Sequence, residues 1–176
     1  ASEITRSLSI AAIRMIVDAL PTAYREPNNV AAREKMATAS LMAGLAFGNA
    51  GVGAVHALAY PLGGRFHLSH GVSNAVMFSH VMKWNRTACP DKFVDIAIAM
   101  GANHSISESD AGEYVVAKIE TLCTAVAIPK QLREFGIKFD DLKELAISAS
   151  AVTRLLRNNP RQFSVRDIED MYEAAY

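Results

Sequence analysis

Apolar residues recur at three- and four-residue intervals along almost the whole chain, which is the spacing typical of amphipathic helices. The first such series runs from Ile4 to Ala19. Pro21 and Pro27 follow it and predict the loop at which this first helix ends. No segment shows the strict alternation of apolar and polar residues, bounded by turn signals, that predicts a strand. The pattern therefore predicts an all-α protein.

Six further segments are expected to be helical. They are residues 30–47, 69–84, 90–100, 108–127, 139–152 and 165–175. The candidate N-caps are Asn29, Ser107, Asp140 and Ser164. With 176 residues the chain has the size of a single domain. We therefore expect a helical bundle-like domain over residues 1–176, with about seven to nine helices.

The composition excludes several classes of partner. Lysine plus arginine and aspartate plus glutamate number 18 each, so no net charge favours nucleic acid or an anionic membrane. No apolar run approaches the ~20 residues that a membrane span requires. Cys89 and Cys123 are too few for a disulfide framework and do not form a C-x-x-C pair. We therefore expect reduced thiols, a cytoplasmic location, and no nucleic acid or membrane partner.

Three of the five histidines lie close together in the sequence, at His56, His67 and His70. On one straight helix His56 and His70 would lie roughly 21 Å apart, whereas two ligands of one ion must each approach it to about 2 Å. The Pro61–Gly64 segment predicts a break that folds the chain back and brings these two histidines together. Tyr60, four residues after His56, would point into the same space.

The spacing leaves two interpretations of this histidine cluster open. A histidine in an apolar helix is usually a buried, hydrogen-bonded core residue, whereas a pair across a glycine-rich break is also typical of a metal site. The glycines at 44, 48, 51 and 53 do not form a phosphate loop, because no lysine with serine or threonine follows them. They indicate either close helix packing or room beside a ligand.

The segment from Gly44 to Asn85, "GLAFGNAGVGAVHALAYPLGGRFHLSHGVSNAVMFSHVMKWN", resembles the second signature of the iron-containing (group III) alcohol dehydrogenases. The similarity extends through "DKFVDIAIAMG" to "NNPRQFSVRDIEDMYEAAY" at the end of the chain. It implies the helical C-terminal domain of that family, in a fold like that of dehydroquinate synthase. It also implies that His56 and His70 are metal ligands.

The resemblance further implies a divalent ion, Fe²⁺ or alternatively Zn²⁺, and NAD or NADP bound by an N-terminal α/β domain. The aspartate and third histidine of the family's metal site would lie in a D-x-x-x-H pattern, which no part of residues 1–26 contains. We therefore expect the 176-residue chain to lack the nucleotide-binding domain and two of the four metal ligands. With two imidazoles and no carboxylate, we expect Fe²⁺ to bind weakly.

Three other positions match functional positions of the family. Phe47 and Val52 match residues that line the substrate side of the cleft, although core packing would explain them as well. Tyr60 stands where many members carry a histidine that assists proton transfer. A phenol with an ordinary pKa of about 10 is a poorer proton shuttle near neutral pH, but it can still donate a hydrogen bond to substrate or cofactor.

Two functions follow as hypotheses. The first is the metal-binding half of an iron-dependent NAD(P) alcohol dehydrogenase, which interconverts a small-molecule alcohol and aldehyde by hydride transfer and is inactive as an isolated fragment. The second is a non-catalytic helical assembly or binding module in which the histidines are structural. We expect a homo-oligomer, because an apolar wall around Phe47, Val52 and His56 would be exposed without a partner domain.

Overall fold

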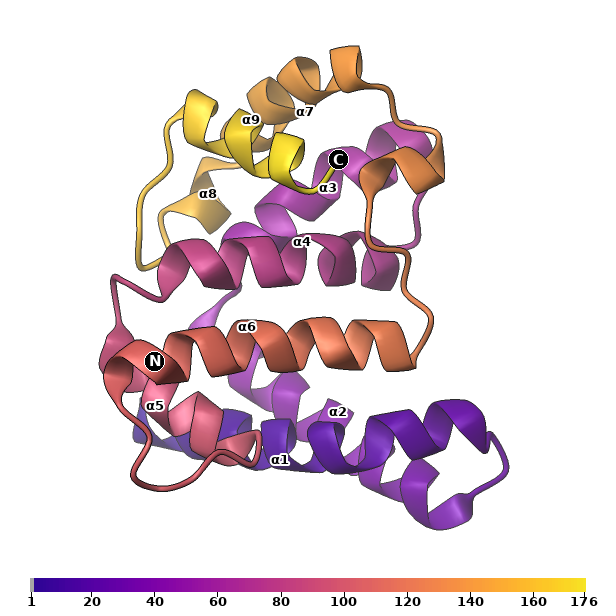
Figure 1. The fold of residues 1–176 in the computed structure, drawn as a ribbon, viewed down its shortest axis with the longest axis vertical. Coiled ribbons are helices and arrows are strands. Elements are labelled where there is room, and N and C mark those ends of the chain that lie inside the picture. The colour runs from indigo at the N-terminus through magenta and orange to yellow at the C-terminus, as the bar shows by residue number, and fades with distance from the viewer. Residues whose placement is uncertain (1) are drawn as a thin grey trace. The chain divides into compact units, whose positions relative to one another are not determined.

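The computed structural model of the chain describes residues 2–176. Within these residues it contains nine α-helices, two short 3-10 helices and no strand (Figure 1). This confirms the predicted all-α class. The α-helices are α1 (Glu3–Arg25), α2 (Val30–Ala50), α3 (Ala54–Phe66), α4 (His70–Asn85), α5 (Pro90–Ala99), α6 (Glu108–Ala125), α7 (Leu142–Ser150), α8 (Thr153–Leu156) and α9 (Val165–Ala174). The 3-10 helices are η1 (Leu132–Phe135) and η2 (Phe139–Asp141).

Three of the four predicted N-caps are confirmed. The side chains of Asn29, Ser107 and Ser164 each accept a hydrogen bond from a backbone N–H in the first turn of the following helix. Asp140 is not a cap, because it lies inside η2, and the residue that precedes α7 is Asp141. A short 3-10 turn therefore replaces the predicted start of this helix.

The first helix does not end at Pro21 as predicted. Helix α1 continues through Pro21 to Arg25, and the backbone N–H of Glu26 still donates to the carbonyl of Thr22 at 2.8 Å. Proline removes one backbone donor from a helix, but the buried face of α1 continues past it to Ala23. The burial of that face against the rest of the unit offsets the lost hydrogen bond.

The chain divides into two compact units, each of which is assembled from two parts of the sequence. Unit 1 contains the described residues up to Gly51 and Cys89–Val126, and therefore α1, α2, α5 and α6. Helices α1 and α2 lie side by side in it, joined by a short turn (Figure 1). Their buried residues are nearly all alanine, which allows the two backbones to approach closely.

Unit 2 contains Val52–Ala88 and Ala127–Tyr176, with α3, α4, α7, α8, α9 and both 3-10 helices. Its core includes Leu58 and Leu62 of α3 and Tyr172 of α9. The Tyr172 hydroxyl donates to the backbone carbonyl of Leu58 at 2.6 Å and ties α9 to α3. Burial raises the pKa of Tyr172 far above its ordinary value, so this phenol is a permanent donor.

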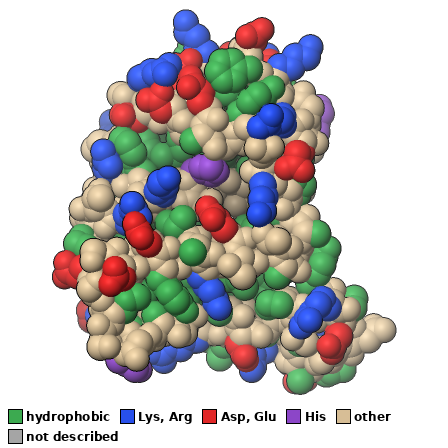
Figure 2. Space-filling view, in the orientation of Figure 1, with side chains coloured by type: hydrophobic (Ala, Val, Ile, Leu, Met, Phe, Trp, Pro, Cys, Tyr) green, Lys and Arg blue, Asp and Glu red, His purple; other side chains and the backbone are tan. Residues whose placement is uncertain are grey.

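Side chains of opposite charge are interspersed on the face that Figure 2 shows, with hydrophobic side chains between them. This agrees with the balanced count of 18 basic and 18 acidic residues. No single helix of the described residues has the length and apolar composition to cross a membrane; α2 and α3 reach them only when taken together across their break. The single domain that the sequence predicts over residues 1–176 stays a prediction.

Candidate metal centre

The histidine cluster lies in unit 2, where α3 carries His56 and Tyr60 and α4 begins at His70. The predicted break at Pro61–Gly64 is wrong, because α3 runs through this segment to Phe66. The chain reverses instead at residues 67–69. His67 takes the left-handed conformation with φ 57°, and its N–H closes α3 on the carbonyl of Gly63 at 3.1 Å. The reversal itself, and its consequence for His56 and His70, are as predicted.

The imidazole rings of His56 and His70 face one another with their centres 5.2 Å apart and their planes inclined by 51°. Two imidazoles that each bind one ion through a nitrogen at about 2.1 Å, at a tetrahedral angle, have ring centres roughly 5 Å apart. The observed separation therefore fits a shared divalent ion.

The electrostatics of His56 favour the protonation state that a metal ligand needs. The side chain is partly buried, and burial lowers the pKa of His56, with a smaller contribution from the nearby His70. Near neutral pH the imidazole of His56 is therefore neutral and carries a lone pair. Neutral imidazole is the form that coordinates metal ions.

Tyr60 lies one helical turn after His56, and its ring centre is 6.4 Å from that of His70. The side chain is 44% exposed, so the hydroxyl remains accessible to a molecule that approaches the two histidines. The structure thus brings together His56, Tyr60 and His70 as the sequence predicts. The role of Tyr60 in proton transfer or hydrogen bonding stays a prediction.

Asn74, one helical turn after His70 on α4, was not among the predicted site residues. Its side-chain nitrogen is 2.7 Å from the backbone oxygen of His70 and 3.2 Å from the Nε2 atom of the His70 ring. The available signal was the four-residue spacing, which places the two side chains on the same face of one helix. Asn74 is therefore part of the surroundings of the candidate metal centre.

The start of α3, and with it the position of His56, depends on a residue far along the chain. The N-cap residue of α3 is Gly53, which has no side chain that could accept a hydrogen bond from the first turn. The Oδ1 atom of the buried Asn159 instead accepts a long hydrogen bond of 3.4 Å from the N–H of Ala54. Asn159 and Asn85 are also joined by two side-chain hydrogen bonds of 2.7 and 3.0 Å. This buried pair fixes the first turn of α3 against α4.

The four glycines between residues 44 and 53 differ in what their surroundings require of them. Gly51 ends α2 with φ 78°, a conformation that favours glycine. A Cβ atom at Gly53 would lie 3.4 Å from Asn159 Oδ1, at the limit of close packing. At Gly44 and Gly48 an added Cβ would meet no atom within 4 Å. Close packing thus explains only part of this glycine-rich segment.

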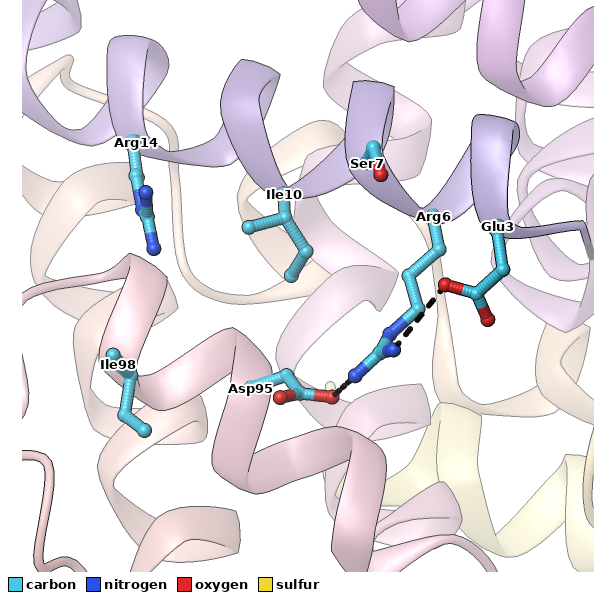
Figure 3. A pocket seen from close by; sticks show the side chains of 7 residues that line it. All are labelled: Glu3, Arg6, Ser7, Ile10, Arg14, Asp95 and Ile98. Carbon is cyan, nitrogen blue, oxygen red and sulfur yellow. Dashed lines mark hydrogen bonds and ion pairs between the residues drawn. The ribbon is translucent and has the colours of Figure 1, made fainter.

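Within the described part of the chain, no further ligand joins the two histidines. Among residues 2–176 no group of three or more histidine, cysteine, aspartate or glutamate side chains is arranged to hold a metal ion. A pocket of about 200 Å³ in unit 1 contains the carboxylates of Glu3 and Asp95, but both are paired with Arg6 (Figure 3). Both carboxylates are thus engaged by one guanidinium, and the pocket is an ion-pair cluster and not a second candidate metal centre.

The two predicted substrate residues belong to different units. Phe47 is 53% exposed and lines a groove of about 680 Å³ in unit 1, whose other walls come from α1 and α5. Val52 belongs to unit 2, where it is partly buried and packs against the core. Their shared role as substrate contacts stays a prediction.

The chain belongs to the Fe-containing alcohol dehydrogenase family: the sequence profile of the C-terminal region of that family matches residues 1–176. It is 44% identical to the long-chain-alcohol dehydrogenase 1 of Geobacillus thermodenitrificans (strain NG80-2), over 100% of this chain and 45% of that protein. It is 35% identical to the NAD-dependent methanol dehydrogenase of Bacillus methanolicus, over 99% and 46%, respectively.

A solved structure described as 1,3-propanediol oxidoreductase superposes on the chain with a TM-score of 0.96 at 40% identity. The superposition covers 100% of this chain and 46% of that structure. The chain therefore spans about half the length of the proteins that it matches. The resemblance inferred from the segment around His56 and His70 is confirmed at the level of family and fold.

Proposed function

We propose that these 176 residues are the metal-binding half of an iron-dependent, NAD(P)-linked alcohol dehydrogenase that interconverts an alcohol and an aldehyde. The observation that carries the proposal is the pair of facing imidazoles, His56 and His70, with ring centres 5.2 Å apart. Membership of the Fe-containing alcohol dehydrogenase family supports the class of reaction. Relatives named for long-chain alcohols and for methanol leave the identity of the alcohol open.

In this proposal His56 and His70 hold Fe²⁺, or Zn²⁺ in its place. Such an ion, when bound, supplies Lewis-acid polarisation of an alcohol or carbonyl oxygen. Partial burial lowers the pKa of His56 and so keeps its imidazole neutral near neutral pH. We propose that the hydroxyl of Tyr60, on the same helix face, donates a hydrogen bond to the substrate oxygen or to the cofactor.

We expect no alcohol oxidation with NAD or NADP from a polypeptide of these 176 residues alone, even with added Fe²⁺. The described residues offer two metal ligands without a carboxylate. They also contain no strand of an α/β nucleotide-binding domain. The dependence on NAD is proposed from the NAD-dependent relative. A longer polypeptide that contains these residues should oxidise alcohols and should lose this activity in the His56→Ala and His70→Ala variants.

The alternative is a non-catalytic assembly module in which the two histidines are structural. Leu41 and Leu45 of α2 favour it, because they are 65% and 50% exposed on an apolar helix, and exposed apolar surface promotes association. We expect self-association of the isolated chain under either proposal. Metal binding separates the two: an assembly module should bind Zn²⁺ no better than its His70→Ala variant, whereas the metal-binding half should lose affinity on this substitution.

His67 supplies the control for these experiments. It lies three residues before His70 and is exposed, but it forms the turn between α3 and α4. The His67→Asn variant replaces the ring by a side chain that tolerates this left-handed conformation and should therefore retain the affinity for Zn²⁺. Equal losses in the variants at His67 and His70 would indicate unspecific surface binding and would contradict the proposed ligand pair.

A further inference from the structure

The side chain of Asn74 makes an unusual set of contacts with His70. Its Nδ2 atom lies 2.7 Å from the His70 backbone oxygen, 3.2 Å from ring atom Nε2 and 3.4 Å from ring atom Nδ1. Both residues are on the first turns of α4. One amide group thus touches the backbone and the ring of the same histidine.

The first of these contacts fixes which end of the amide faces His70. The backbone oxygen of His70 is an acceptor, so the atom 2.7 Å from it must be a donor. If the amide were rotated by half a turn, two oxygens without a hydrogen between them would face each other. Asn74 therefore presents its NH₂ group, and not its oxygen, to His70.

The two ring distances then show where this NH₂ group lies. An atom almost equally close to both ring nitrogens cannot lie in the plane of the imidazole without overlapping the carbon between them. It lies against the face of the ring, in the manner of a weak N–H to π contact. The lone pair of the unprotonated ring nitrogen lies in the ring plane, so the contact restrains the ring without occupying the electrons that a metal would use.

The same geometry has a cost for folding. The Oδ1 atom of Asn74 is buried, and it has no hydrogen-bond partner within residues 2–176. A buried acceptor without a partner destabilises a protein. A hydrocarbon side chain of the same shape would avoid this cost, so the buried oxygen gives no stability reason for asparagine at position 74.

We infer that Asn74 is a positioning residue that holds the His70 imidazole with its free nitrogen directed toward the ion shared with His56. This inference rests on the proposed function, because it requires the two histidines to be ligands. Residues that orient a ligating histidine typically change metal affinity by 10- to 100-fold when they are removed. Asn74 does so through the ring face, without a hydrogen bond to a ring nitrogen in its plane.

The test uses the 176-residue chain with Zn²⁺ as the only added ligand. Leucine has nearly the shape of asparagine but no buried acceptor, so the Asn74→Leu variant should bind Zn²⁺ roughly 10- to 100-fold more weakly while its unfolding temperature stays equal or rises. Nuclear Overhauser contacts between the rings of His56 and His70 should weaken in the same variant. The Asn74→Ala variant, with a good helix former, should lose affinity similarly and provides a second test.

The His70→Ala variant distinguishes failure of this inference from failure of the proposed function. If His70→Ala removes Zn²⁺ binding and Asn74→Leu leaves it unchanged, the positioning role is wrong and the ligand pair stands. If His70→Ala leaves Zn²⁺ binding unchanged, the ligand pair itself is wrong, and the inference falls with it. Unchanged ring contacts in Asn74→Leu would also overturn the positioning role.

Discussion

Substitution of Asn159 by alanine should strongly destabilise unit 2, because this one buried side chain takes part in four hydrogen bonds. Its Oδ1 accepts from the N–H of Ala54 at 3.4 Å and from Asn85 at 3.0 Å, and its Nδ2 donates at 2.7 Å to Asn85 and at 2.7 Å to the carbonyl of Arg161. Alanine removes all four bonds. It leaves both ends of the buried Asn85 amide, and the start of α3, without these partners.

The magnitude follows from the number and quality of these bonds. A typical hydrogen bond contributes about 1 kcal/mol to stability, so four would contribute about 4 kcal/mol. One of them is long, and bonds that share a network are not additive, which lowers the expected loss to about 3 kcal/mol. For a protein of this size that loss corresponds to a decrease in the unfolding temperature of roughly 6–12 °C.

The assay is urea denaturation followed by circular dichroism, with Asn49→Ala as the matched control. Asn49 is exposed on α2, and its side chain donates one bond, to the carbonyl of Leu45. Its substitution should change the free energy of unfolding by less than about 0.5 kcal/mol. A loss below about 1 kcal/mol in Asn159→Ala, or equal losses in both variants, would refute the view that the Asn85–Asn159 pair anchors the first turn of α3.

Three further outcomes are expected. Tyr172→Phe keeps the ring but loses the bond from the buried hydroxyl to Leu58, and thermal unfolding should show a loss of about 1 kcal/mol; no change would mean that this bond does not stabilise the fold. Ala127 holds φ 56°, so Ala127→Gly should stabilise by roughly 0.5 kcal/mol in the same assay, and destabilisation would contradict the strain. Because burial lowers the pKa of His56, the unfolded chain binds a proton near pH 6.5 that the folded chain does not. The free energy of unfolding should therefore decrease as the pH falls from about 6.5 through the pKa of His56 in the folded chain. The decrease should be smaller in the His56→Gln variant. Equal pH dependence of the unmodified chain and this variant would contradict the assignment.

The helices were predictable because each apolar face has a helical period and several N-caps are local in sequence. Asn29, Ser107 and Ser164 bond to backbone groups only a few residues away, so their role can be inferred without knowledge of the fold. The continuation of α1 through Pro21 was not predictable in this way. It depends on the burial of Ala23 in unit 1, and burial is a property of the folded unit.

The candidate site shows the same division between local and distant causes. The pairing of His56 with His70 was predictable, since some reversal had to occur between them if they were to share an ion. Its position at His67 was not, because helix α3 tolerates Pro61 and Gly63 within its length. The anchor at Asn159 was also beyond prediction, since 105 positions separate it from Ala54.

The proposed function depends above all on His56 and His70 binding one divalent ion together. This can be measured by an anaerobic titration of the chain with Fe²⁺, followed through the imidazole resonances of all five histidines in nuclear magnetic resonance spectra. If the two histidines share the ion, their resonances should broaden together and at the same Fe²⁺ concentration, before those of His67, His80 and His104. Broadening of His67 at the same concentration as His70, with His56 unaffected, would contradict the shared site.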